Sequence, residues 1–347
     1  MEIADLLLFA VEKSASDLHV SAHMPPMIRL NGDIRKLSVP PLGEKEVHDM
    51  LYDIMNDRQR KVFENSLEVD FSFDIQNLGR FRVNVFHQSR GIAGVFRIIP
   101  TKMWTLDDIG APEIFKTILK ETRGIVLVTG PTGSGKSTTL AAMLNEINEH
   151  LSGHIITLED PIEFVHENKK CLIHQRELGE HTLSFSAALR ASLREDPDVI
   201  LVGEMRDLET IRLALTAAET GHLVLSTVHT SSAPKTIDRI VDVFPAGEKE
   251  LVRTMLAESV QAIVAQVLLK RTDGHGRIAA HEIMLGTPAI RNLIRENKIA
   301  QLYSIMQSGQ ALGMKTLDQA LADLIKQNKV EPHEARMKAV NKSNFTT

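Results

Sequence analysis

The spacing of apolar and polar positions changes twice along the chain. Before about residue 100, two runs alternate strictly, and they carry Phe71, Phe73 and Ile75, then Phe81, Val83 and Val85. Such alternation is typical of half-buried antiparallel strands. Residues 3–11 keep helical spacing, and residues 27–37 predict a hairpin because Asn31-Gly32 suits a two-residue turn with positive φ. We therefore expect a mixed helix and strand domain over residues 1–100.

After residue 123 the apolar positions form short unbroken runs, at 125–128, 154–158, 199–202 and 223–228, separated by longer helical stretches. Strands that are apolar on both faces and alternate with helices are typical of a parallel sheet covered on both sides. We expect this core to span residues 123–270, behind a linker at 101–122. Strand signals fade after residue 270, so residues 271–347 are expected to be helical.

The sharpest motif is GPTGSGKST at residues 130–138, between an apolar strand and a helical stretch. Its glycines let backbone N–H groups approach phosphates, and the helix N-terminus adds its dipole. The Lys136 ammonium can reach the β- and γ-phosphates, and the Ser137 hydroxyl can ligate Mg²⁺. A nucleoside triphosphate is therefore expected to bind Gly130, Pro131, Thr132, Gly133, Ser134, Gly135, Lys136, Ser137 and Thr138.

Acidic residues follow two other predicted strands. Glu204 comes after the run at 199–202, while Glu159 and Asp160 end the run at 154–158, with Glu163 shortly after. Ligands of parallel sheets lie beyond the carboxyl ends of the strands, so an acid there can hold Mg²⁺ or orient an attacking water. A single acid is equally well explained as a solvated strand end, but the neighbouring phosphate-binding motif favours the functional interpretation.

Two histidines, His222 and His229, bracket the run at 223–228. A metal pair is disfavoured, because Cys171 is the only thiol of the chain. Contact with a γ-phosphate and a hydrogen-bonded core position remain as alternatives.

Composition narrows the class of protein. The 40 Lys and Arg against 45 Asp and Glu give a net charge of −5, and only 4% of residues are aromatic, which disfavours a nucleic-acid-binding surface. One cysteine excludes an internal disulfide and a multi-cysteine zinc site. Since no uncharged apolar run reaches about 18 residues, no membrane-spanning helix is expected. The chain reads as a soluble, intracellular protein of two or three domains.

Four segments together resemble the secretion ATPases, the RecA-like hexameric motors of type II secretion and type IV pili. They are GPTGSGKST as Walker A, ITLEDPIEFVH as Asp box, LREDPDVILVGEMRD as Walker B and TGHLVLSTVHT as His box. The segment SASDLHVSAHMPPMIRLNGDIRKL resembles the start of their PAS-like N-terminal domain. The segment AIRNLIRENK, residues 289–298, resembles a C-terminal signature of the pilus retraction branch.

The resemblance implies a RecA-like P-loop motor domain with a parallel-rich sheet, preceded by a PAS-like α+β domain and followed by a helical C-terminal region. It implies Glu163 as general base, Glu204 as the acid near Mg²⁺, and His222 and His229 near the γ-phosphate and a subunit interface.

Arginines of the N-terminal domain complete the site as fingers in this family. The matching positions are Arg82 and Arg97, with Arg80, Arg90 and Arg123 as competitors.

The implied activity is ATP hydrolysis by a cytoplasmic homohexamer with ATP and Mg²⁺, which retracts type IV pili by moving an inner-membrane platform protein. Membrane association would occur through that partner, without insertion, and no nucleic acid is expected. The alternatives are the extension motor of the same machine, a RecA-like nucleic-acid motor and a P-loop kinase. Assembly ATPases of this superfamily usually carry a tetracysteine motif and an extra N-terminal domain. Here the sequence has one cysteine and the PAS-like segment begins almost at Met1, so retraction is expected rather than extension.

The AIRNLI segment has two interpretations. Ile290, Leu293 and Ile294 form a helical stripe, which is usually ordinary packing. The resemblance favours a role in coupling hydrolysis to retraction.

Overall fold

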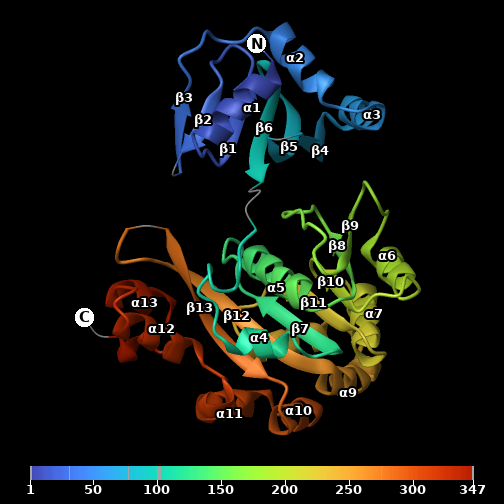
Figure 1. Cartoon of the computed structure of the whole chain (residues 1–347), viewed down its shortest axis with the longest axis vertical. Coiled ribbons are helices and arrows are strands. Elements are labelled where there is room, and N and C mark those ends of the chain that lie inside the picture. Colours follow the sequence, from blue (N-terminus) through green and yellow to red (C-terminus); the bar gives the residue numbers. More distant parts are fainter. Residues whose placement is uncertain (1, 31, 77, 100–102, 275, 346–347) are drawn as a thin grey trace. The chain divides into compact units, whose positions relative to one another are not determined.

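The computed structural model describes residues 2–30, 32–76, 78–99, 103–274 and 276–345. The chain divides into two compact units, residues 1–102 and residues 103–347 (Figure 1). Each unit is built on a sheet of its own. Among the described helices, none is long and apolar enough to cross a membrane.

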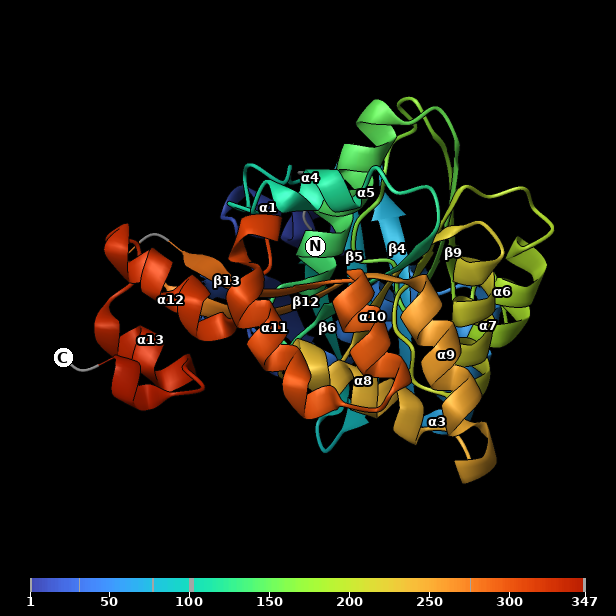
Figure 2. The same cartoon turned by 90° about the horizontal axis from the view of Figure 1, so that it is seen from below.

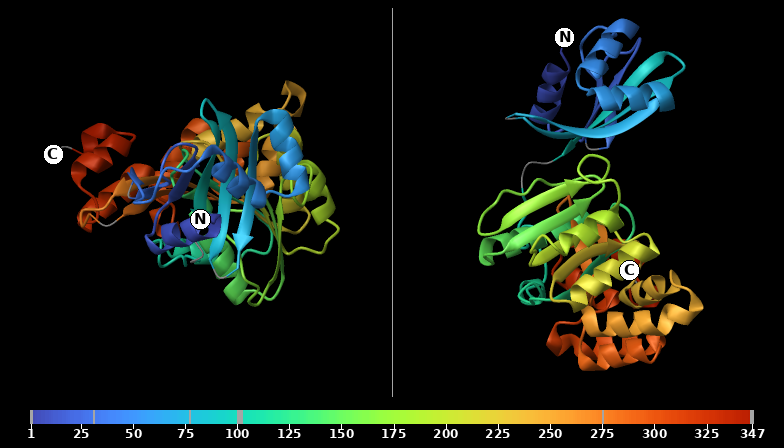
Figure 3. Two further views of the ribbon diagram at one scale, coloured as in Figure 1. Left: turned by 90° about the horizontal axis from the view of Figure 1, so that it is seen from above. Right: turned by 90° about the vertical axis from the view of Figure 1, so that its right-hand side faces the viewer.

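The first unit holds a six-stranded antiparallel sheet with the order β3-β2-β1-β6-β5-β4. Its strands are β1 (Asp17–Ser21), β2 (Met27–Leu30), β3 (Asp33–Lys36), β4 (Glu68–Ile75), β5 (Gly79–Gln88) and β6 (Gly91–Ile99). Its helices are α1 (Ile3–Glu12), α2 (Glu44–Asp53) and α3 (Asp57–Ser66). The three helices lie on one face of the sheet, as the right-hand view of Figure 3 shows.

The alternating pattern of the first unit is confirmed. Phe81, Val83 and Val85 are fully buried and pack in one cluster with side chains of all three helices. The hairpin at 27–37 is also confirmed, because Leu30 pairs with Asp33 across β2 and β3 and Gly32 has a φ of +96°. Asn31 of the predicted turn lies outside the described residues.

The second unit holds a seven-stranded sheet with the order β13-β12-β7-β11-β10-β8-β9. Its strands are β7 (Gly124–Thr129), β8 (His154–Glu159), β9 (Leu172–Glu177), β10 (Val199–Val202), β11 (Leu223–Val228), β12 (Val260–Lys270) and β13 (Arg277–Leu285). Six of these strands run parallel, and β13 joins one edge antiparallel to β12. The predicted parallel-rich α/β sheet is therefore confirmed.

Helices cover both faces of this sheet. One face packs against α4 (Ile114–Ile118) and α5 (Lys136–His150). The other packs against α6 (Phe185–Ser192), α7 (Leu208–Glu219), α8 (Ala233–Asp242), α9 (Lys249–Ser259), α10 (Pro288–Arg295) and α11 (Leu302–Ser308). Figure 2 shows helices α8 to α11 gathered on that side. The apolar run of β7 is unbroken because both faces of the strand are buried. Ile125 and Leu127 face one helix layer, while Val126 and Val128 face the other.

Two stretches differ from the sequence expectation. Leu106, Phe115 and Ile118, from the expected linker, are buried in the core of the second unit, so most of that stretch belongs to this unit. Beyond residue 270 the first element is strand β13, not a helix, so the expected boundary at 270 cuts a hairpin.

The rest of the C-terminal region is helical, as predicted. It ends in α12 (Leu317–Lys326) and α13 (Pro332–Lys338), which pack against Leu269 and Ile278 at the end of the β12–β13 hairpin. Short 3₁₀ turns complete the unit at η1 (Ala246–Glu248), η2 (Ile299–Gln301), η3 (Gly309–Leu312) and η4 (Lys342–Asn344).

Candidate functional site

The GPTGSGKST segment forms a loop between the end of β7 and the start of α5. Gly130, Gly133 and Gly135 all have positive φ, at +146°, +77° and +85°. A Cβ atom at Gly130 would collide with the backbone oxygen of Gln266 and lie 2.5 Å from Ser134 Oγ. Only glycine therefore fits this turn, and the turn is what aims successive backbone N–H groups toward an anion.

Lys136 begins helix α5 and folds back over the loop. Its Nζ donates hydrogen bonds to Gly130 O at 2.9 Å and Pro131 O at 3.1 Å. Burial lowers the pKa of Lys136, while the charges of Glu204 and Glu163 act in the opposite direction. Both acids predicted for the site are therefore close enough for their charges to act on this ammonium group.

The residues of the loop fit a nucleotide with Mg²⁺. Pro131, Thr132 and Gly133 are exposed at its crest, and no atom lies within 4 Å of a Cβ placed on Gly133. Ser137 and Thr138 are half-buried in the first turn of α5. Hydroxyl and carboxylate oxygens, such as those of Ser137 and Glu204, are the ligands that Mg²⁺ prefers.

Gln266 of strand β12 holds the loop from behind, and sequence reasoning missed it. Its side chain is buried, with Nε2 donating to Ser134 O at 2.6 Å and Oε1 accepting from Thr139 Oγ1 at 2.9 Å. The signal that could have found it is a glutamine inside the apolar run AIVAQVLL, because a buried amide needs polar partners.

Glu204 lies just beyond β10 with a largely buried carboxylate. It forms an ion pair with Arg206, and His229 Nε2 lies 3.5 Å from Glu204 Oε2. The turn is tied to the end of β11, since Thr227 Oγ1 donates to Gly203 O at 2.7 Å. The structure thus brings His229 and Glu204 together, and it adds Arg206, which the sequence analysis did not single out.

Glu163 lies in the loop that follows β8, and its side chain is exposed. Nearby, Glu159 ends β8 and accepts hydrogen bonds from Thr157 Oγ1 at 2.6 Å and Gln175 Nε2 at 3.1 Å. Desolvation raises the pKa of Glu159 to about 7, and the charge of Glu163 adds to this rise. Glu159 is therefore a carboxyl that keeps its proton to a higher pH than an ordinary glutamate does.

His222 is not near the phosphate-binding loop of its own chain, which corrects the sequence expectation. It precedes β11, and its backbone oxygen accepts from Gly124 N at 3.0 Å, at the amino end of β7. The loop begins after the carboxyl end of the same strand, six residues or about 20 Å away at about 3.3 Å per residue. The His222 Nδ1–H donates to Ala217 O at 3.0 Å, as expected of a structural histidine.

Arg82 and Arg97 lie opposite each other on β5 and β6 of the first unit. Arg82 Nη2 donates to Asp70 Oδ2 at 2.9 Å. Arg97 Nε donates to Oδ1 of the buried Asp17 at 3.2 Å, while 65% of the Arg97 side chain stays exposed. Their assignment as arginine fingers stays a prediction.

The three alternative arginine fingers lie in different parts of the chain. Arg80 pairs with Asp74 at 2.9 Å on the same sheet, Arg90 lies in the turn before β6, and Arg123 belongs to the second unit, where its backbone oxygen accepts from Gln261 Nε2.

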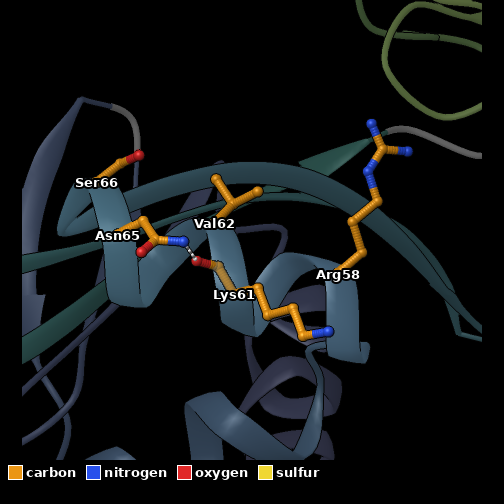
Figure 4. A pocket seen from close by; sticks show the side chains of 5 residues that line it. All are labelled: Arg58, Lys61, Val62, Asn65 and Ser66. Atoms are coloured by element: carbon orange, nitrogen blue, oxygen red, sulfur yellow. Dashed lines mark hydrogen bonds between the residues drawn. The ribbon is translucent and has the colours of Figure 1, made fainter.

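The first unit also carries a shallow pocket over α3, lined by Arg58, Lys61, Val62, Asn65 and Ser66 (Figure 4). The side chains come from successive turns of one helix and spread outward. Within the group, Asn65 Nδ2 donates to Lys61 O at 2.8 Å. With no carboxylate, imidazole or thiol among its lining residues, this pocket gathers none of the groups that would serve as a general base.

The AIRNLI segment forms helix α10, in which Ile290 and Ile294 are fully buried. Arg291 donates to Gly286 O at 2.6 Å, to Ala257 O at 2.9 Å and to Gln261 Oε1 at 3.1 Å. The segment therefore packs on the core and fastens α10 to the end of α9. Its role in coupling stays a prediction.

Comparison with known proteins agrees with this architecture. The family model described as type II/IV secretion system protein matches residues 2–340. The type IV pilus retraction ATPase PilT of Pseudomonas aeruginosa is 61% identical over 345 residues, which are 99% of this chain and 100% of that protein. A twitching motility protein of Neisseria gonorrhoeae is 60% identical over 94% of this chain and 87% of its own length.

A solved structure, a crystal structure of the pilus retraction motor PilT with bound ADP, superposes with a TM-score of 0.94 at 45% identity. It covers 99% of this chain and 98% of that one. The chain therefore belongs to the type II/IV secretion system protein family, among its type IV pilus retraction ATPases.

Proposed function

We propose that the chain hydrolyses ATP as a cytoplasmic homohexameric motor that retracts type IV pili. The observation that carries the proposal is the glycine loop with Lys136, on which the charges of Glu163 and Glu204 both act. The loop would bind the phosphates of the nucleotide. Of the two carboxylates beside it, Glu204 would bind Mg²⁺ and Glu163 would accept a proton from water. The similarity to a retraction motor solved with ADP supports the choice of nucleotide.

In this mechanism the loop positions the triphosphate. Lys136 exchanges its hydrogen bonds to Gly130 O and Pro131 O for phosphate oxygens, and backbone N–H groups at the start of α5 add further donors. Ser137 and Glu204 would hold Mg²⁺, which when bound would supply positive charge against the phosphate oxygens.

Glu163 is proposed to accept the proton of the attacking water. The water oxygen bonds to the γ-phosphorus as the bond to the leaving oxygen of ADP breaks, and the proton is released later with phosphate. The exposed position of the Glu163 side chain suits this task, because a base must reach a water molecule. His229 beside Glu204 and arginines such as Arg82 and Arg97 would stabilise the charge that develops on the phosphoryl oxygens.

The similarity to retraction motors supports a proposal for the partner and the location. Hydrolysis in the ring would move an inner-membrane platform protein, so that pilin returns to the membrane. The motor would associate with the inner membrane through this partner, and His222 would act at a subunit interface.

The test separates binding from chemistry. Lys136→Ala is expected to weaken binding of a fluorescent ATP analogue and to abolish phosphate release, because the loop loses its only buried cation. Glu163→Gln is expected to bind the analogue with unchanged affinity while phosphate release falls by about 10²-fold or more. Glu167→Gln, an exposed acid later in the same loop, serves as control. Normal hydrolysis by Glu163→Gln would remove the general-base assignment.

Deletion of the gene tests the direction of the motor. Loss of a retraction motor leaves cells piliated but without twitching motility, whereas loss of an extension motor leaves cells without pili. Stimulation of hydrolysis by single-stranded DNA would instead favour a nucleic-acid motor, and a phosphorylated small acceptor would favour a kinase.

A further inference from the structure

The loop that carries Glu163 connects two neighbouring parallel strands, β8 and β9, at the edge of the sheet. The exposed Glu163 lies between two buried apolar residues, Ile162 and Phe164. These two side chains anchor the loop in the protein. The direction of the Glu163 side chain still depends on how the backbone between them is held.

Gln175 of β9 makes three hydrogen bonds at this point. Its Nε2 donates to Phe164 O at 2.8 Å and to Glu159 Oε1 at 3.1 Å, while its Oε1 accepts from His166 N at 2.7 Å. A single amide side chain therefore satisfies a donor and an acceptor of the loop backbone just after Glu163.

Glu177 holds the loop on the other side of Glu163. Its side chain is buried, and Oε2 accepts from Ile162 N at 3.1 Å. Residues two apart on a strand point to the same face, so Gln175 and Glu177 reach the loop together. The backbone is thus bonded at residues 162, 164 and 166, and Glu163 projects from the middle of this frame.

The frame has a catalytic consequence, because general-base catalysis depends on geometry. A displacement of about 1 Å at a reacting group can cost about 10²-fold in rate. Removing the Gln175 amide leaves Phe164 O and His166 N without this partner, so the loop can relax toward water. The phosphate-binding loop makes its own contacts on β12 and does not share these hydrogen bonds.

We propose that Gln175 and Glu177 are positioning residues for Glu163 that hold its loop in the orientation needed to activate water. This inference rests on the proposed function. It predicts a split between catalysis and binding, since the frame touches the base and not the phosphate cradle.

The first experiment compares Gln175→Ala with Leu172→Ala, an exposed residue on the opposite face of the same strand. For Gln175→Ala, kcat should fall by about 10- to 100-fold. The Kd for a fluorescent ATP analogue should stay within about twofold, and amide hydrogen exchange at His166 should quicken. Leu172→Ala should leave all three unchanged. If Gln175→Ala does not fold, Gln175→Glu keeps the acceptor for His166 N and takes its place.

A double-mutant cycle decides whether Gln175 acts through Glu163. In the Glu163→Gln background, Gln175→Ala should cause no further loss of kcat. Additive losses, or a parallel fall in kcat and affinity, would overturn the inference, as would wild-type kcat in Gln175→Ala. If Glu163→Gln itself hydrolyses ATP normally, the proposed general base fails. If only Gln175→Ala is normal, the positioning role alone fails.

Discussion

Replacing Gln266 by leucine tests whether strand β12 holds the phosphate-binding loop. Leucine has nearly the same volume as glutamine but removes both polar atoms. The change leaves two groups buried without their partner, namely the Ser134 carbonyl and the Thr139 hydroxyl. Packing should be retained, so the variant reports on the two hydrogen bonds.

The size of the effect follows from those two groups. A buried polar group that loses its partner costs about 1–3 kcal/mol. The Thr139 hydroxyl can turn to a carbonyl of its own helix, so the lower part of the range applies and the total is about 3 kcal/mol. For a domain of this size each kcal/mol lowers Tm by about 2–4 °C, which gives a fall of about 6–12 °C. Affinity for ATP should fall by about tenfold, because the loop must be reordered on binding.

Thermal unfolding followed by circular dichroism measures the first effect, and titration with a fluorescent ATP analogue measures the second. Gln261→Leu is the matched control, because it makes the same change on the same strand at a half-buried position. It should cost about 1 kcal/mol and leave affinity unchanged. A Tm for Gln266→Leu within about 2 °C of the wild type would refute the reasoning.

Three further variants test other side chains of the second unit. Because the pKa of Glu159 is raised to about 7, the folded chain keeps a proton that the unfolded chain releases, so stability falls as pH rises from about 4.5 to 7. Urea unfolding of Glu159→Gln at several pH values should show this slope reduced. Burial lowers the pKa of His281 to about 4, so the free energy of unfolding falls as pH drops from 6.5 to 4. In His281→Leu the free energy of unfolding should fall less over this pH range. Arg291→Ala should lower stability by about 1–3 kcal/mol while ATP affinity stays within about twofold, which calorimetry and titration would check.

Features that depend only on neighbouring residues in the sequence could be predicted from it. The loop at 130–135 needs glycine because of backbone conformation within a few residues, so its motif identifies it. Strands β7 and β10 are buried along their whole length and therefore read as unbroken apolar runs.

Features that depend on contacts between residues far apart in the sequence could not be predicted. Strand β13 carries His281 and Glu282 in buried positions, and a pattern of apolar residues counts such positions as surface. Glu282 is buried because its carboxylate accepts from Ala233 N at 2.7 Å and Leu317 N at 3.3 Å, at the starts of α8 and α12. Strand β9 was missed for the same reason, since Gln175 and Glu177 find their partners in another segment.

The error on His222 has a different origin. His222 and His229 flank one strand. His222 precedes its amino end and His229 follows its carboxyl end, so the two residues are separated by the length of a six-residue strand. Only the histidine after the strand can face the phosphate-binding loop, which also follows a strand running in the same direction. Strand direction alone would have separated the two residues.

The bond between Thr139 and Gln266 spans 127 residues, and this separation sets an order of events during protein synthesis. At about 5–20 residues per second, the ribosome adds Gln266 about 6–25 s after Thr139. Throughout that interval the nascent chain carries the complete GPTGSGKST segment without the strand that fixes its shape. The growing polypeptide thus acquires the final shape of this glycine loop late, when β12 emerges and inserts beside β7.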